Sequence, residues 1–170
     1  MNYSDYFTIL NIDFPVREKL YHELNYAISK NLFYKSPTQQ VRFNINKNLR
    51  AEIQDMMPFK ISDCGFFKNV PNWTYPVHID GQRLFAINML MVGNHDDFEV
   101  VFYVDDSSLA NDIDGTDKEK FRIPYAKDQL VLLNTKKYHS VRNTSNTTTR
   151  YLLSIGNIDT SYHEIKNKFI

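Results

Sequence analysis

Residues 75–92 read YPVHIDGQRLFAINMLMV, and this stretch decides the fold. Its first half predicts a strand that ends at a turn formed by Gly81 and Gln82. The second half is an almost unbroken apolar run, which is typical of a strand buried in the protein interior. The stretch therefore predicts two successive strands of a mainly β protein.

Three potential metal ligands lie in and after this stretch. His78 and Asp80 are separated by one residue, and alternate residues of a strand point to the same face, so both side chains are expected to reach one ion. His139 follows an apolar strand at 129–133 after a short polar turn. Two imidazoles and one carboxylate form the facial triad that binds Fe(II) and leaves positions open for a co-substrate and O2.

Arg150 adds a group of a different kind. It opens the last apolar run, residues 150–155, and a guanidinium is suited to bidentate binding of a carboxylate. His78 and Asp80 share one predicted strand, and His139 and Arg150 belong to others, which a β-barrel can bring together. The sequence thus predicts an oxygenase site with His78, Asp80 and His139 as metal ligands and Arg150 as the carboxylate-binding group.

Helices are predicted before this region and at the end of the chain. Residues 6–14 alternate like an edge strand, and Pro15 then starts a helix, because proline suits the first helical turn. A break is expected at residues 35–38, a second short helix at 46–56 and a C-terminal helix at 162–169. The apolar faces of the first two helices are predicted from helical spacing to contain Val16, Leu20, Leu24 and Ile28, and Leu49, Ile53 and Met57.

Helices followed by a run of short strands indicate an α+β, mainly β fold with a jelly-roll core. The length of 170 residues favours a single domain. We expect a helical N-terminal part over about 1–57 that braces the core, a jelly-roll core over about 58–157, and a short C-terminal tail.

The composition limits the compartment and the partners. The 20 basic and 20 acidic residues leave no net charge, which argues against binding to nucleic acid or to an anionic membrane. Cys64 is the only cysteine, so neither a disulfide framework nor a thiolate metal cluster is expected. The N-terminal sequence lacks the features of a signal peptide, and no apolar run reaches membrane-spanning length. These features favour a cytoplasmic protein.

The order His-x-Asp, distal His and then Arg resembles the Fe(II)- and 2-oxoglutarate-dependent oxygenases. The resemblance extends over roughly residues 64–156. It is most similar to small single-domain members, including the aspartyl/asparaginyl hydroxylase-like and prolyl hydroxylase-like groups. Their core is a double-stranded β-helix, a cupin-like jelly roll that is preceded by helices, and the same architecture is therefore implied here.

The resemblance also implies roles for the four residues. His78, Asp80 and His139 would bind Fe(II), and Arg150 would bind the distal carboxylate of 2-oxoglutarate. The expected reaction consumes O2, releases succinate and CO2, and oxidises a small molecule or a protein or peptide side chain. A halogenase of this superfamily would lack the ligand carboxylate, so Asp80 favours hydroxylation or a related oxidation.

Further residues near the predicted site have weaker assignments. If Asn88 faces inward together with Ala86 and Leu90, its amide can bind the keto acid; the alternative is that it satisfies buried backbone groups. Arg83 is expected to be a solvated turn arginine, and Arg142 is a less favoured carboxylate binder than Arg150. Trp73 and Tyr75 are expected either to pack in the core or to line the substrate site. The acidic run 105–117 is predicted to be a loop at the mouth of the barrel.

Two other functions stay open at this stage. A cupin-like metal enzyme would use the same barrel and metal without 2-oxoglutarate, although it would have no need of Arg150. A metal-free jelly-roll binding module would make His78 and His139 incidental. Metal binding and keto-acid binding distinguish the three readings.

Overall fold

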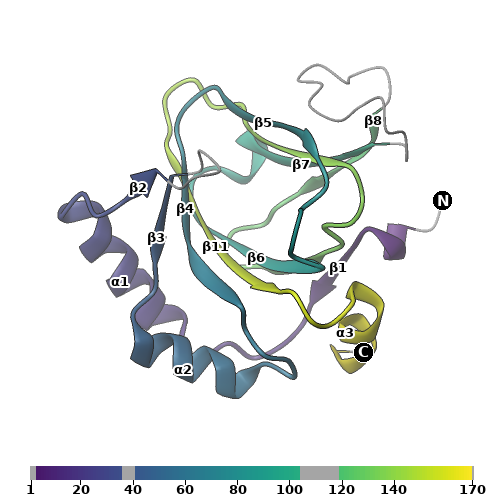
Figure 1. Cartoon of the computed structure of the whole chain (residues 1–170). Coiled ribbons are helices and arrows are strands. Elements are labelled where there is room, and N and C mark those ends of the chain that lie inside the picture. Colours follow the sequence, from purple (N-terminus) through teal and green to yellow (C-terminus); the bar gives the residue numbers. More distant parts are fainter. Residues whose placement is uncertain (1–2, 36–40, 104–118, 170) are drawn as a thin grey trace.

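The strands of the chain form two antiparallel sheets. The structure is a computed structural model that describes residues 3–35, 41–103 and 119–169. Within these ranges, a seven-stranded sheet has the order β1-β9-β6-β11-β4-β3-β2, and a four-stranded sheet has the order β5-β10-β7-β8 (Figure 1). The strands are β1 (Phe7–Leu10), β2 (Tyr34–Lys35), β3 (Val41–Asn44), β4 (Asp63–Asn69), β5 (Trp73–His78), β6 (Phe85–Val92), β7 (Phe98–Tyr103), β8 (Glu119–Pro124), β9 (Leu130–Leu133), β10 (His139–Asn143) and β11 (Arg150–Asn157).

The strands from β4 to β11 pass back and forth between the two sheets. Strands β4, β6, β9 and β11 belong to the larger sheet, and β5, β7, β8 and β10 form the smaller one. Every strand pair within either sheet is antiparallel. This winding is a double-stranded β-helix, so the predicted jelly-roll core is confirmed.

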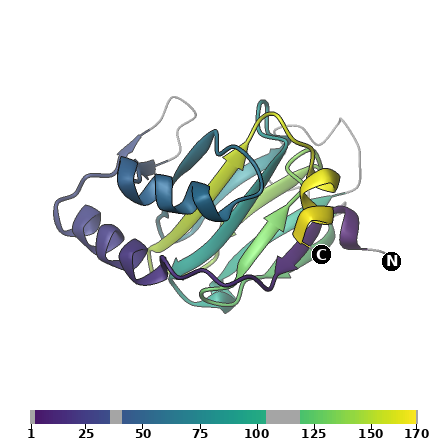
Figure 2. The same cartoon turned by 90° about the horizontal axis from the view of Figure 1, so that it is seen from below.

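The larger sheet is covered on both of its faces, which explains its nearly continuous apolar strands. Figure 2 shows the helices α1 (Arg17–Ser29) and α2 (Lys47–Met56) lying across its outer face, with α3 (Tyr162–Phe169) at one end. Alternate residues of β6 pack on the helices, namely Phe85, Ile87, Met89 and Met91. Leu90 points the other way, into the apolar cluster between the sheets. The interior of the barrel therefore receives Ala86 and Asn88 as well.

The predicted helices are confirmed with small changes. In α2, Leu49 and Ile53 are buried and Met57 is buried just after it, while the Asn46 side chain caps the helix by accepting a hydrogen bond from Leu49 N at 3.0 Å. In α1 the buried residues are Leu20, Leu24 and Ala27, whereas Ile28 is 37% exposed. The assignment of Ile28 to the buried face was wrong. Ala27, seven positions after Leu20, lies nearer the centre of the apolar stripe than Ile28 does.

The N-terminal part is less purely helical than predicted. Strand β1 pairs with β9 and is the expected edge strand, but it is confined to Phe7–Leu10. Strands β2 and β3 pair with each other, and β3 continues the larger sheet beside β4. The predicted break at 35–38 therefore begins within a strand, and its remaining residues lie outside the described ranges. Short extended segments of this kind are stabilised by pairing with a neighbouring strand, which a local pattern does not reveal.

The candidate ligands lie at the ends of strands or in the connections next to them. Strand β5 ends at His78 and β6 begins at Phe85, so Asp80 lies in the connection after the strand. The expectation that Asp80 shares a strand face with His78 was therefore wrong, although the two side chains still meet. Strand β10 begins at His139 and β11 begins at Arg150. Residues 105–117, predicted to be a loop at the barrel mouth, lie outside the described part of the chain. None of the described helices is long and apolar enough to cross a membrane.

Candidate metal centre

His78 and His139 face each other across a strand pair. The last residue of β5 is in register with the first residue of β10, and the two imidazole centroids are 4.3 Å apart. Asp80 joins them because its backbone N–H donates to Thr135 O at 3.0 Å, in the loop before β10. One potential ligand atom from each of His78, Asp80 and His139 lies within 4.8 Å of the others. Sequence-distant residues thus form the predicted cluster.

Both imidazoles are oriented by the backbone. His78 Nδ1 lies 2.8 Å from Pro76 O, and His139 Nδ1 lies 2.9 Å from Lys137 O. A carbonyl oxygen only accepts, so each Nδ1 carries the proton and each Nε2 keeps its lone pair. Metal-binding histidines are fixed in this manner, with one nitrogen bonded to a backbone carbonyl and the other directed to the ion. The tautomers of both histidines therefore suit metal binding.

Asp80 is ionised in this surrounding. Its side chain is 10% exposed, Oδ1 lies 3.3 Å from His78 Nε2, and Oδ2 accepts from Arg83 Nε at 2.9 Å. Burial raises the pKa of this carboxyl group, but the neighbouring His78 imidazole and the guanidinium of Arg83 outweigh that effect and hold the pKa well below its usual range. The carboxylate is therefore available as an anionic oxygen ligand.

His139 is neutral for the opposite reason. It is 4% exposed, and burial, together with the neighbouring His78 imidazole, lowers its pKa to about 4. A neutral imidazole has the lone pair that a metal ion requires. Two imidazole nitrogens and one carboxylate oxygen at one end of a pocket are the donor set of a non-haem Fe(II) site. The residues present therefore fit that ion.

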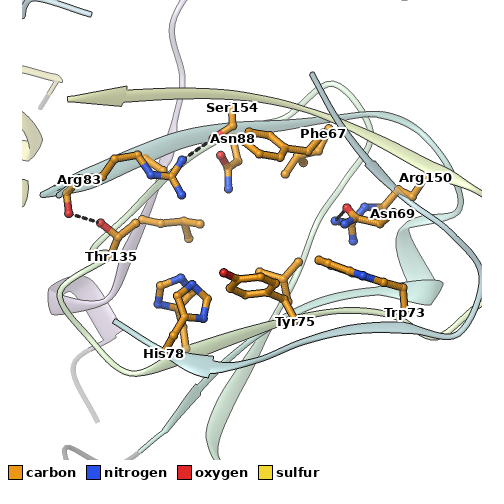
Figure 3. A pocket seen from close by; sticks show the side chains of 15 residues that line it. Phe67, Asn69, Trp73, Tyr75, His78, Arg83, Asn88, Thr135, Arg150 and Ser154 are labelled. Atoms are coloured by element: carbon orange, nitrogen blue, oxygen red, sulfur yellow. Dashed lines mark hydrogen bonds between the residues drawn. The ribbon is translucent and has the colours of Figure 1, made fainter. Parts of the chain in front are cut away.

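His78 and His139 of the cluster line one end of a pocket between the two sheets. The space that this lining encloses, counted out to the open mouth, is about 520 Å³. Figure 3 shows His78 and Arg83 at one end, Arg150 and Asn69 at the other, and Asn88 and Tyr75 directed into the space between them. The lining residues are Phe67, Asn69, Trp73, Tyr75, His78, Arg83, Ala86, Asn88, Leu133, Thr135, His139, Val141, Arg150, Leu152 and Ser154.

Arg150 forms the far end of the pocket and is 1% exposed. Its NH2 donates to Asn69 Oδ1 at 2.6 Å, its NH1 donates to Arg142 O at 3.3 Å, and its guanidinium stacks on the ring of Phe98. Within the described ranges its Nε has no hydrogen-bond partner, and no carboxylate forms an ion pair with it. The charge of a buried cation that is bonded only to neutral oxygens is uncompensated, and an anion in the pocket would balance it.

Asn88 faces inward as the sequence pattern indicated, and its amide lies beside the central space of the pocket (Figure 3). Its Oδ1 is buried without a hydrogen-bond partner among the residues that the structure describes. The backbone-satisfying role is therefore not seen for this oxygen. Binding of the keto acid by Asn88 stays a prediction.

Arg83 differs most from its sequence interpretation. It was expected to be solvated, yet it lies in the pocket wall and is paired with Asp80 through two nitrogens. Trp73 and Tyr75 both line the pocket, and the Tyr75 ring meets His78 edge to face at 4.5 Å. Sequence reasoning missed Asn69, whose proximity to Arg150 comes from the pairing of β4 with β11.

An open groove adjoins the metal cluster on its other side. It is lined by His78, Asp80 and Arg83 together with Tyr75, and by the exposed side chains of Ile79 and Ile158. Arg42 and Asp63 form an ion pair in its wall. The candidate ligands thus lie between an inner pocket and an outer groove.

Comparison with known proteins places the fold. No protein-family model matches the sequence, and no curated protein is similar to it. Among solved structures, the chain is similar to the non-haem α-ketoglutarate-dependent carbocyclase SnoK of nogalamycin biosynthesis, with 10% identity, a TM-score of 0.64, and coverage of 91% of this chain and 80% of that one. A prolyl hydroxylase from Trichoplax adhaerens, solved with a hypoxia-inducible-factor peptide, has 12% identity, a TM-score of 0.63 and coverage of 91% and 84%.

HygX from Streptomyces hygroscopicus, solved with nickel and 2-oxoglutarate bound, has 12% identity, a TM-score of 0.56 and coverage of 91% and 83%. At these identities the likeness concerns the fold. The chain has the double-stranded β-helix fold of the Fe(II)- and 2-oxoglutarate-dependent oxygenases, with a His-Asp-His cluster at the mouth of its barrel.

Proposed function

We propose that this protein is an Fe(II)- and 2-oxoglutarate-dependent dioxygenase that hydroxylates a small molecule or a protein or peptide side chain. The observation that carries the proposal is the pairing of two features in one pocket. A metal-binding cluster lies at one end, and the buried Arg150, whose charge has no carboxylate partner among the described residues, lies at the other. A dicarboxylic keto acid has a chelating end and a carboxylate end, which match these two features.

The residues would divide the work as follows. His78, Asp80 and His139 hold Fe(II), and Arg150 binds the distal carboxylate of 2-oxoglutarate while Asn69 orients the guanidinium. Asn88 offers an amide to the body of the keto acid. A bound Fe(II) would supply coordination sites for the keto acid and O2, and the redox chemistry by which a C–H bond is hydroxylated while 2-oxoglutarate is converted to succinate and CO2. With only three protein ligands, the ion keeps positions for both co-substrates.

The primary substrate would approach through the outer groove. Its apolar side chains Tyr75, Ile79 and Ile158 offer contact area, and the Arg42–Asp63 pair offers both charges at its wall. Two of the structural neighbours differ in the class of molecule they are associated with, since one is a carbocyclase of a biosynthetic pathway and the other was solved with a peptide. Both substrate classes therefore stay within the proposal.

Anaerobic titration of the protein with Fe(II) and then with 2-oxoglutarate tests the proposal. A weak visible metal-to-ligand charge-transfer band is expected, because the band requires keto-acid chelation of a ferrous centre. His139→Ala and Asp80→Ala should abolish metal binding while leaving the circular dichroism spectrum unchanged, and His22→Ala, which changes an exposed histidine on α1, is the matched control.

The other outcomes identify the alternatives. Iron binding without the band, at any 2-oxoglutarate concentration, would indicate a cupin-like metal enzyme. Absence of iron binding would indicate a metal-free binding module. Metal binding that survives in His139→Ala and Asp80→Ala would refute the assigned ligand set.

A further inference from the structure

Arg83 holds one oxygen of the metal-ligand carboxylate. Its Nε donates to Asp80 Oδ2 at 2.9 Å, and its NH2 lies 2.8 Å from the same oxygen. The other carboxylate oxygen, Oδ1, is the one that lies 3.3 Å from His78 Nε2, on the side of the histidines. The two oxygens of Asp80 therefore have separate surroundings, and Oδ1 alone is turned toward the candidate ion.

Arg83 is itself held on three sides. Its NH1 donates to Ser154 Oγ at 3.2 Å, and its backbone O accepts from Thr135 Oγ1 at 3.0 Å (Figure 3). All three guanidinium nitrogens thus have partners, and its side chain is only 21% exposed. A side chain in this state is placed to orient a neighbour.

Gly156 of strand β11 has no side chain, and Arg83 occupies the space that a side chain there would fill. A Cβ added at Gly156 would lie 2.5 Å from Arg83 Cδ and 3.3 Å from its Cγ. Real Cβ atoms essentially never show the shorter distance, so a side chain at this position requires the Arg83 stem to shift. The absence of a side chain at Gly156 is thus a condition for the path that Arg83 takes to Asp80.

The loop that carries Asp80 is also tied to the loop before His139. Besides the Asp80 N–H to Thr135 O bond, Lys136 Nζ donates to Asp80 O at 2.8 Å and to Gly81 O at 3.1 Å. The backbone of Asp80 is therefore fixed relative to the second histidine. What remains free is the rotation of the carboxylate, and Arg83 removes that freedom.

From these contacts we propose that Arg83 is a positioning residue for the metal centre. It occupies Asp80 Oδ2 so that the carboxylate binds the ion through Oδ1 alone. This role rests on the proposed function, because it requires that the cluster binds a metal. Its consequence is a coordination number of three from the protein, since a carboxylate released from Arg83 is able to rotate and offer both oxygens to the ion.

Metal affinity and the spectrum of bound Co(II) test this role without any turnover. We expect Arg83→Met to weaken Co(II) and Fe(II) binding about 10- to 100-fold in anaerobic titration calorimetry, which is the usual effect of losing a group that orients a ligand. The Co(II) absorption bands should also change in shape, because they report the number and arrangement of the ligands. Arg83→Lys, which keeps one donor for Oδ2, should restore most of the affinity.

Two glycine variants separate positioning from the loss of charge. Gly156→Ala retains the Arg83 charge but displaces the side chain, so it should weaken metal binding in the same direction as Arg83→Met. Gly81→Ala is the matched control, because a Cβ there meets nothing within 4 Å. Arg122→Met, which breaks an exposed arginine pair with Glu99 on the other sheet, controls for the loss of an ion pair.

The outcomes separate this inference from the proposed function. If the wild-type protein has no affinity for Co(II) or Fe(II), both are overturned. If the wild type binds but Arg83→Met and Gly156→Ala bind with unchanged affinity and unchanged Co(II) bands, the positioning role alone is overturned. Melting temperatures of all variants, measured without metal, identify any variant that fails to fold.

Discussion

Replacing Arg150 by methionine separates two effects of its buried charge, namely its effect on the free energy of unfolding and its effect on the affinity for 2-oxoglutarate. In the absence of a ligand, the guanidinium is 1% exposed, burial lowers its pKa below the usual range, and its partners are the neutral oxygens of Asn69 and Arg142. Methionine has a similar length and no charge to desolvate. We therefore expect Arg150→Met to bind 2-oxoglutarate poorly and yet to fold as well as the wild type.

The sizes of the two effects follow from the contacts. Loss of two hydrogen bonds costs about 1 kcal/mol each, and removal of an uncompensated buried charge offsets that loss, so the free energy of unfolding should change by less than about 1 kcal/mol or rise. The binding free energy of 2-oxoglutarate should fall by a larger amount. A buried carboxylate left without its cation costs about 2–5 kcal/mol. At about 1.4 kcal/mol per tenfold, the Kd for 2-oxoglutarate should rise at least about 30-fold.

Two measurements check these values. Anaerobic titration of the Fe(II) protein, followed by the charge-transfer band, gives the Kd for 2-oxoglutarate, and urea unfolding of the apoprotein gives the free energy of unfolding. Arg142→Met is the matched control, because Arg142 is the other arginine near this end of the pocket and donates to Tyr103 Oη. An unchanged Kd in Arg150→Met, or a larger increase in Arg142→Met, would refute the assignment of the distal carboxylate to Arg150.

Two further predictions concern the scaffold. Ile53→Ala should lower the free energy of unfolding by about 2–5 kcal/mol in urea titrations, since Ile53 is fully buried between α2 and the sheet, whereas Asp55→Ala on the exposed side should change it by less than about 0.5 kcal/mol. Burial raises the pKa of Cys64 to about 12, so at pH 8 its thiol should react with iodoacetamide far more slowly in native protein than in 6 M guanidinium, and equal rates would contradict its burial.

The sequence predicted the elements whose patterns are long and strongly periodic. The apolar run of β6 and the spaced apolar residues of α2 each identify their element without any knowledge of the rest of the chain. The short strands β2 and β3 were missed because two to four residues give no reliable period. Their extended state comes from the pairing of β2 with β3 and of β3 with β4, and the second of these is a tertiary contact.

The candidate site was predicted as a set of residue types and only partly as a geometry. His78, Asp80, His139 and Arg150 were selected by their spacing and their chemistry, and the structure brings the first three together and places Arg150 in the same pocket. Asp80 was assigned to a strand that ends before it. Its convergence with His139 depends instead on its hydrogen bond to Thr135, which no sequence period reports.

The two arginines of the pocket show why such residues escape local reasoning. Arg83 crosses the space above Gly156, and Arg150 crosses the space above Gly93, where a Cβ would lie 2.9 Å from Arg150 Cγ and where the backbone φ is +125°. A guanidinium reaches the interior in each case because a glycine on another segment leaves room for its stem. Whether an arginine is a solvated surface residue or a buried positioning group is therefore decided by a residue distant in sequence. A substitution at Gly156 should therefore disturb the pocket through Arg83, and one at Gly93 should disturb it through Arg150, although neither glycine is itself assigned to the metal or the co-substrate.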